Sequence, residues 1–114
     1  MGTVAIVDYG VGNLKSVANA LSYLGCSSCI TADPAELERA DAIILPGVGA
    51  FPDAADRLRS GGLDQHVLAQ GQKKPVLGIC LGMQLLLEQG REVRPCPGLG
   101  VIRGTVDRIQ VGGQ

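Results

Sequence analysis

Aromatic residues are scarce in this chain of 114 residues, and neither sign of charge is in excess. Aromatic side chains make up 3% of the sequence, with no tryptophan, so no platform exists on which nucleic-acid bases could stack. Ten Lys and Arg residues against eleven Asp and Glu residues leave a net charge of −1, which provides no basic surface for a phosphate backbone. We therefore expect no nucleic-acid partner.

Long apolar runs are also missing. The apolar stretch over residues 3–7 is interrupted by Asp8 and is too short for the hydrophobic segment of a signal peptide or for a membrane span. This pattern predicts a cytoplasmic protein with no membrane partner.

Four cysteines, Cys26, Cys29, Cys80 and Cys96, raise the question of disulfides or a zinc site. Cys26 and Cys29 have the spacing of a zinc knuckle, but a second close pair is lacking and the single histidine, His66, has no ligand-like neighbour. Without a secretion signal, reduced thiols are the better interpretation. We expect neither a bound metal nor a cofactor.

Strand and helix signals alternate along the chain. Apolar runs predict four strands, and apolar residues at helical spacing predict the helices that follow them. The strands are expected at residues 4–7, 29–31, 42–45 and 75–79, and the helices at 14–24, 34–39, 53–59, 63–70 and 81–89. Asn13 and Asp33 are expected N-caps, and Gly25 stands where a helix ends.

Uninterrupted apolar strands are typical of a parallel sheet covered by helices on both faces. The predicted fold class is α/β, a flavodoxin-like three-layer sandwich with a mostly parallel sheet, formed by residues 1–114 as one domain. Residues 101–111 alternate between polar and apolar types, which predicts an edge strand or hairpin with one wet face.

The stretch Gly78-Ile79-Cys80-Leu81-Gly82 places a cysteine between a predicted strand and a predicted helix. The two glycines indicate a turn that strains the cysteine backbone and leaves no room for neighbouring Cβ atoms. Such a thiol lies at the carboxyl end of the sheet, and a helix N-terminus beside it favours the reactive thiolate. The Leu81 N–H would face an oxyanion formed when Cys80 attacks a carbonyl. The alternative is a buried structural cysteine, which the paired glycines make less favourable.

Two further loops carry paired glycines. In Pro46-Gly47-Val48-Gly49 the backbone can approach a ligand closely and offer a second oxyanion donor, although an ordinary turn before a helix is the alternative. The loop Asp8-Tyr9-Gly10-Val11-Gly12-Asn13 partly matches a dinucleotide-binding turn but lacks its third glycine. A tight turn that presents polar groups to a partner is the preferred interpretation of this loop.

Together these stretches resemble the class I glutamine amidotransferases. Gly78-Ile79-Cys80-Leu81-Gly82-Met83-Gln84 is similar to the nucleophile turn of that family. Residues 8–14 and 45–51 are similar to the signatures of its histidine-pathway subfamily, the glutaminase subunits of imidazole glycerol phosphate synthase, and Gly98-Leu99-Gly100 also fits. The resemblance runs through the whole chain.

The resemblance implies a mechanism and a set of site residues. Cys80 would attack the side-chain amide of glutamine, forming a glutamyl thioester and releasing ammonia. The oxyanion would be bound by the backbone N–H of Leu81 and by an N–H from Val48 or Gly49. Bound glutamine would contact Gly47, Gly49 and Gln84. Ammonia would pass to a partner, a cyclase (β/α)₈ barrel subunit, which the loop of Tyr9, Gly10, Val11, Gly12 and Asn13 would face.

The catalytic histidine and glutamate of the family lie near the end of its chain, and nothing in these 114 residues matches them. His66 precedes Cys80 on a predicted peripheral helix and is a poor substitute. The chain is therefore predicted to be the nucleophile half of the domain and inactive alone, because loss of the base costs ~10⁴ to 10⁶ in turnover.

Two alternatives stay open. One is a non-catalytic interaction module that binds a partner or forms a homodimer through an exposed sheet edge. The other is a different cysteine hydrolase whose base is donated across a dimer.

Overall fold

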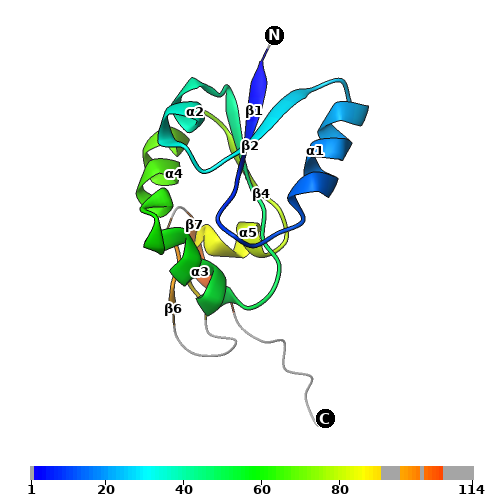
Figure 1. The fold of residues 1–114 in the computed structure, drawn as a ribbon. Coiled ribbons are helices and arrows are strands. Elements are labelled where there is room, and N and C mark those ends of the chain that lie inside the picture. Colours follow the sequence, from blue (N-terminus) through cyan, green and yellow to red (C-terminus); the bar gives the residue numbers. More distant parts are fainter. Residues whose placement is uncertain (1, 91–95, 101, 107–114) are drawn as a thin grey trace.

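The computed structural model of the protein describes residues 2–90, 96–100 and 102–106. Its main sheet has four strands in the order β2-β1-β3-β4, and every neighbouring pair is parallel (Figure 1). The strands are β1 (Thr3–Val7), β2 (Ser27–Thr31), β3 (Ala42–Leu45) and β4 (Val76–Gly78). The predicted α/β fold with four parallel strands is confirmed.

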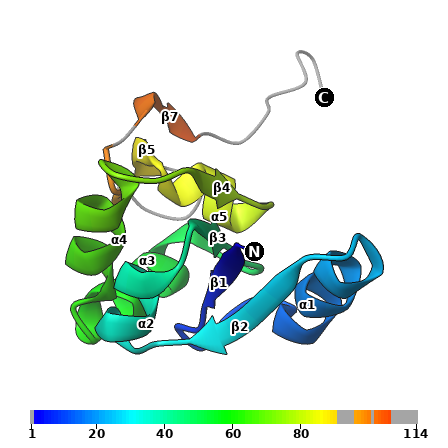
Figure 2. The same ribbon diagram turned by 90° about the horizontal axis from the view of Figure 1, so that it is seen from above.

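Helices lie on both faces of this sheet, which gives three layers (Figure 2). One face carries α1 (Leu14–Tyr23), and the other carries α2 (Pro34–Arg39), α3 (Phe51–Ser60) and α4 (Leu63–Gly71). The short helix α5 (Leu81–Leu85) follows β4 directly. None of the helices in the described ranges is long and apolar enough to cross a membrane.

The hydrophobic core lies mainly on the face of α2, α3 and α4. Alternate residues of the central strands point to that face, and they pack with apolar side chains from these helices and from α5. The members include Ala5, Val7, Ile43 and Leu45 from the sheet and Leu37, Phe51, Leu58, Val67 and Leu85 from the helices. None of the ten residues of α1 is buried, so the two faces of the sheet are covered very unequally.

The predicted helix caps are in place. The Asn13 side chain accepts a hydrogen bond from the Ser16 N–H at 3.4 Å, and the Asp33 carboxylate accepts one from the Ala35 N–H at 3.0 Å. Each supplies a partner for a backbone donor that the first turn of a helix leaves unpaired. Gly25, just past α1, has a φ of 81°, a conformation that glycine adopts without strain.

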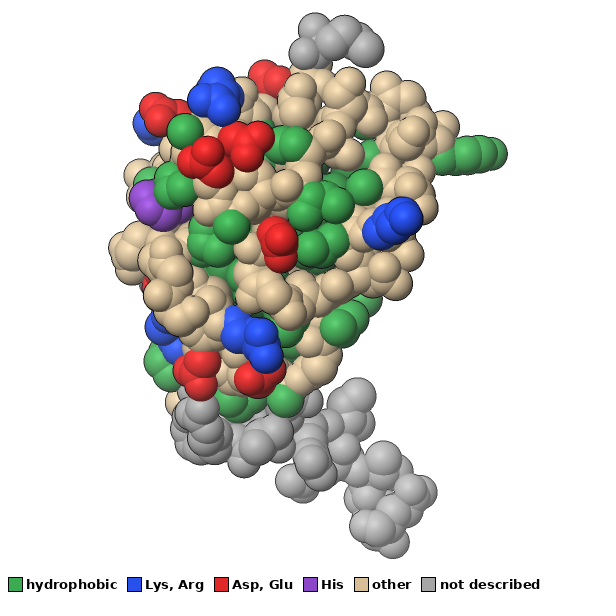
Figure 3. Space-filling view, viewed as in Figure 1, with side chains coloured by type: hydrophobic (Ala, Val, Ile, Leu, Met, Phe, Trp, Pro, Cys, Tyr) green, Lys and Arg blue, Asp and Glu red, His purple; other side chains and the backbone are tan. Residues whose placement is uncertain are grey.

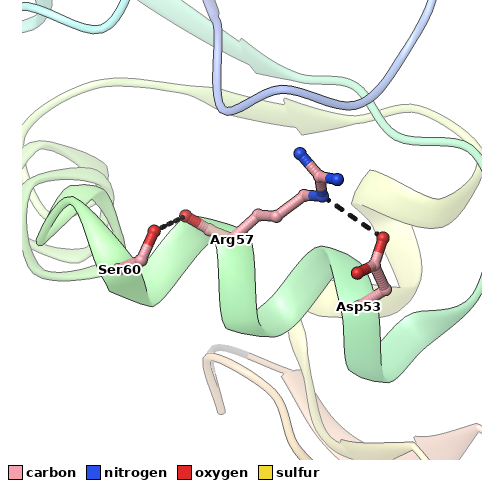
Figure 4. A network of polar contacts seen from close by, with 3 residues as sticks. All are labelled: Asp53, Arg57 and Ser60. Atoms are coloured by element: carbon pink, nitrogen blue, oxygen red, sulfur yellow. Dashed lines mark hydrogen bonds and ion pairs between the residues drawn. The ribbon is translucent and has the colours of Figure 1, made fainter.

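Helix α3 begins at Phe51, two residues after the loop of residues 46–49, and carries local polar contacts on its outer face (Figure 4). Arg57 Nε donates to Asp53 Oδ2 at 3.3 Å, and Ser60 Oγ donates to the Arg57 carbonyl at 2.9 Å. Both ionic side chains are exposed, so this pair contributes little to stability. The helix is held instead by its buried face, which includes Phe51 and Leu58.

The helix predicted over residues 81–89 is wrong in its second half. Helix α5 ends at Leu85, and β5 (Leu87–Gly90) begins a second sheet with β6 (Cys96–Pro97) and β7 (Ile102–Val106), in the order β6-β5-β7. The Leu99 N–H donates to the Leu85 carbonyl at 2.7 Å, and the Gly100 N–H donates to the Leu87 carbonyl at 3.0 Å. A distant segment thus pairs with the carbonyls that a longer helix would have used.

The edge strand predicted over residues 101–111 is found in part. β7 pairs in parallel with β5, with a register shift between Leu87 and Gln89. Residue 101 and residues 107–111 of that prediction lie outside the described residues.

The Lys74 side chain binds the C-terminal end of α2, although it lies more than 30 residues later in the sequence. Its Nζ donates to the carbonyls of Leu37, Glu38 and Ala40 at 2.8, 2.8 and 2.6 Å. These carbonyls lie at the C-terminus of the helix, where a positive charge is favoured. One ammonium group therefore anchors α2 to the turn that precedes β4.

We predict that Lys74→Met lowers the free energy of unfolding by about 1–3 kcal/mol, because three carbonyls lose a charged donor. Urea denaturation measures the change. The neighbouring exposed Lys73→Met is the matched control, expected to stay within about 0.5 kcal/mol of the wild type. Equal effects of the two substitutions would contradict the anchoring role of Lys74.

Candidate active site

Cys80 lies at the turn between β4 and α5, with an exposed side chain. Its φ is 54° and its ψ is −123°, and it is the only non-glycine residue with a positive φ in the part of the chain that the structure describes. A side chain in this region of φ and ψ costs on the order of 1–3 kcal/mol, so the surrounding structure has to impose it.

Gly78 and Gly82 show how the turn is imposed. A Cβ added at Gly78 would lie 2.5 Å from the Met83 Cα, and one added at Gly82 would lie 1.8 Å from the Leu45 carbonyl oxygen. Both contacts are with backbone, which cannot move aside as a flexible side chain can. The predicted lack of room for neighbouring Cβ atoms is confirmed at both glycines.

The second glycine loop, residues 46–49, passes directly beside this turn. The Leu81 N–H donates to the Gly47 carbonyl at 3.2 Å, and the Ile79 N–H donates to the Leu45 carbonyl at 3.0 Å. A Cβ added at Gly47 would lie 2.9 Å from the Gly82 nitrogen. The carboxyl ends of β3 and β4 are therefore packed backbone to backbone, and in this structure the Leu81 N–H is already occupied.

Tyr9 does not face outward as predicted. Its side chain is 5% exposed and belongs to the core, and its hydroxyl donates a hydrogen bond to the Pro46 carbonyl. Tyr9 is thus a support for the loop of residues 46–49 rather than a contact surface. No pattern in the sequence indicates this burial, because a tyrosine in a glycine loop is equally compatible with exposure. Burial raises the pKa of Tyr9 to about 12.

The raised pKa predicts alkaline sensitivity. An unfolded tyrosine loses its proton near pH 10, whereas the buried Tyr9 keeps its proton to about pH 12, so rising pH favours the unfolded state between these values. Tyr9→Phe should cost about 1–2 kcal/mol at pH 8 through the lost hydrogen bond. The advantage of the wild type over this variant should then shrink by about 1 kcal/mol for each pH unit above 10.

Denaturation curves for both proteins between pH 8 and about 11 measure this difference. Tyr23→Phe is the control at a side chain that is 91% exposed, and it should lie within about 0.5 kcal/mol of the wild type at pH 8. A constant difference between wild type and Tyr9→Phe at all pH values would show that Tyr9 is not buried as described.

The predicted site residues come together around one hollow of about 300 Å³, which is at the small end of ligand pockets. Its lining consists of Gly47, Val48, Gly49, Cys80, Leu81 and Gln84. The Gln84 Oε1 atom is buried and has no hydrogen-bond partner within the described ranges. A buried acceptor without a partner is costly, and a ligand that donates to it would remove that cost.

Gly10 and Asn13 are exposed, and Gly12 is half-buried, so this part of the first glycine loop is accessible. Gly10 and Gly12 have φ values of 91° and 110°, which the tight turn requires. Val11 packs against the core instead.

The remaining candidates lie elsewhere. His66 is exposed on α4 and does not line the hollow beside Cys80. Cys26 is exposed before β2, and Cys29 lies within β2, where burial and then the Glu36 carboxylate raise the pKa of its thiol. No group of three His, Cys, Asp or Glu side chains among the described residues could hold a metal ion.

Known proteins match almost the whole chain. HisH, a subunit of imidazole glycerol phosphate synthase, from Bacillus anthracis (strain CDC 684 / NRRL 3495) is 47% identical over 109 residues, which are 95% of this chain and 52% of that protein. The HisH subunit of Symbiobacterium thermophilum is 51% identical over 113 residues, which are 98% of this chain and 53% of that protein. The chain thus spans about half the length of the curated relatives it matches.

A crystal structure of a glutamine amidotransferase superposes with a TM-score of 0.78 and 25% identity, covering 99% of this chain and 60% of that one. The family model for glutamine amidotransferase class-I matches residues 5–110. Because this match covers nearly all residues of the chain, the chain belongs to the class-I glutamine amidotransferase family.

Proposed function

We propose that residues 1–114 are the nucleophile-bearing half of a glutaminase domain that supplies ammonia to imidazole glycerol phosphate synthase in histidine biosynthesis. The observation that carries this proposal is the hollow that Cys80, residues 47–49 and Gln84 line together. The names of the relatives at 47% and 51% identity support the pathway.

In the proposed reaction, the Cys80 sulfur attacks the carbonyl carbon of the glutamine side chain. The C–N bond of the resulting tetrahedral intermediate breaks, and the nitrogen leaves with a proton as ammonia, so that a glutamyl thioester remains. Water then hydrolyses the thioester to glutamate and restores the thiol. The exposed, outward position of Cys80 above the sheet supports the first step.

Gln84 is proposed to bind the substrate. Its buried Oε1 has no hydrogen-bond donor among the described residues. It can accept a hydrogen bond from the ammonium or amide group of glutamine. Gly47 and Gly49 line the hollow and carry no side chain, so they are proposed to let the substrate lie against the backbone.

The oxyanion requires a rearrangement of the loop. The Leu81 N–H donates to the Gly47 carbonyl, whose oxygen would repel a developing negative charge beside it. We infer that the peptide between Gly47 and Val48 turns over, which frees the Leu81 N–H and brings the Val48 N–H toward the intermediate. Gly49 supports this motion, since its φ is 98° and no atom lies within 4 Å of its Cβ position.

The general base is proposed to come from the part of the relatives' length that this chain does not span. His66 is on α4, outside the hollow, so it is not proposed as the base. The 114 residues alone are expected to bind glutamine without turning it over, because loss of the base costs ~10⁴ to 10⁶ in rate.

A cyclase (β/α)₈ barrel is the proposed receiver of the ammonia. The accessible backbone of Gly10, Gly12 and Asn13 is the proposed contact, with Val11 packed beneath it and Tyr9 removed from the surface. The cytoplasmic location and a homodimer through the sheet edge remain predictions.

The test uses a diazoketone analogue of L-glutamine, which alkylates a thiol only where the glutamine part binds beside it. We expect the analogue to label Cys80 and not Cys26, although both thiols are exposed and both should react with iodoacetamide. L-Glutamine should protect Cys80, and D-glutamine should not. Mass spectrometry of the digested protein reads out each cysteine separately.

The role of Gln84 is tested in the same assay. Gln84→Met keeps the size of the side chain and removes its acceptor, so labelling of Cys80 should slow about tenfold. Gln65→Met, an exposed change on α4, is the matched control and should have no effect. Equal labelling of Cys26 and Cys80 by the analogue, or glutamate release by the 114 residues alone, would contradict the proposal.

A further inference from the structure

Cys80 borders a second hollow, on the face of the sheet that α1 covers. This α1-side hollow has a volume of about 340 Å³ and lies between α1, the strands β3 and β4, and the loop of residues 46–49. Only Gly47, Val48 and Cys80 line both this hollow and the hollow that contains Gln84. One cysteine thus lies between two separate spaces.

The lining of the α1-side hollow is almost entirely apolar. Besides the Cys80 thiol, its only polar side chains are Asn13 and Ser16, and the Asn13 oxygen already accepts a hydrogen bond from the Ser16 N–H. The charged ends of a glutamine molecule would lose water here without gaining a partner, whereas an aliphatic chain would be favoured. The apolar members include Val17, Leu21 and Leu24 of α1, Ile44 of β3 and Leu77 of β4.

Exposed apolar side chains are concentrated around this hollow. Six large apolar side chains among the described residues are exposed, and three of them line it: Leu24 at 72%, Leu77 at 57% and Val48 at 56%. Figure 3 shows apolar side chains at the surface between the central strands and α1. An aliphatic group bound there would remove apolar surface from water, and the volume is in the range of small-molecule sites.

The absence of an acid or base beside Cys80 restricts amides more than thioesters. Neither hollow is lined by a His, Asp, Glu, Lys or Arg side chain among the described residues. The nitrogen of an amide must take up a proton as it leaves, which such a group would supply. A thiolate is a far better leaving group and departs without a proton, so a thioester can react with Cys80 unaided.

We propose that Cys80 accepts an aliphatic acyl group from a thioester, with the acyl chain lying in the α1-side hollow. The Cys80 thiol first releases its proton to water, and the thiolate attacks the carbonyl carbon of the thioester. The bond between that carbon and the donor sulfur then breaks, and the donor thiolate takes up a proton from water. The products are acylated Cys80 and the free thiol of the donor. This activity uses the nucleophile of the proposed function but not its glutamine site.

The test is incubation of the 114-residue chain with the N-acetylcysteamine thioesters of acetic, butyric, hexanoic and octanoic acid, below the concentrations at which these form micelles. Acylation of Cys80 should become faster on the order of tenfold for each added pair of CH₂ groups until the hollow is filled. Cys26 is exposed but does not line the hollow, so its acylation should not depend on chain length. Mass spectrometry of the digested protein measures both cysteines in one reaction.

Variants of the lining test where the acyl chain lies. Leu77→Asn places a polar amide in the hollow and should slow octanoyl transfer to Cys80 about tenfold, with acetyl transfer unchanged. Leu24→Asn, on α1, should have the same effect, so the test does not depend on the stability of one variant. Met83→Asn is the matched control: Met83 is 54% exposed and does not line the α1-side hollow, so neither rate should change.

The same variants separate this activity from the proposed function. Leu77→Asn should leave labelling of Cys80 by the glutamine analogue unchanged, because Leu77 does not line the hollow that contains Gln84. Octanoyl transfer to Cys80 without labelling by the analogue would contradict the proposed function and leave the acyl site standing.

Three outcomes would overturn the acyl site. These are equal rates of acetyl and octanoyl transfer to Cys80, the same dependence on chain length at Cys26, or equal losses with Leu77→Asn and Met83→Asn. If the glutamine analogue still labelled Cys80 in that case, the proposed function would stand without the acyl site.

Discussion

The close packing of two backbone turns is the constraint on which the site depends. Where β3 and β4 end, the α-carbon of Gly82 lies so near the Leu45 carbonyl that a Cβ would be 1.8 Å from its oxygen. This approach fixes the start of α5 against the loop of residues 46–49, and it leaves Cys80 in a conformation that an L-residue rarely adopts. The thiol at this turn is exposed.

The support for this arrangement comes from one side of the sheet. Tyr9 is buried beneath the loop of residues 46–49 and binds the Pro46 carbonyl, while Phe51 anchors the helix that follows. The other side, beneath α1, is only partly covered, and its apolar hollow ends at Cys80. The site therefore lies at the boundary between the packed core and this partly covered face.

Much of this could be predicted from the sequence, because the strands are apolar runs and two of the helices, α1 and α2, follow the side-chain caps Asn13 and Asp33. The tight turn around Cys80 could also be predicted, because glycines at positions 78 and 82 indicate a turn with no room for a Cβ atom. The end of α5 at Leu85 could not, since it depends on hydrogen bonds from residues 99 and 100. The position of Tyr9 was likewise set by packing between segments far apart in the sequence.

The strained backbone at Cys80 can be measured directly by comparing the stability of Cys80→Gly with that of Cys80→Ala. In ordinary backbone conformations glycine is the less stable of the two by about 0.5–1 kcal/mol. At a φ of 54° and a ψ of −123° the order should reverse, with Cys80→Gly more stable than Cys80→Ala by about 1–2 kcal/mol in urea denaturation. Equal stability, or a more stable alanine variant, would show that the turn does not strain this residue.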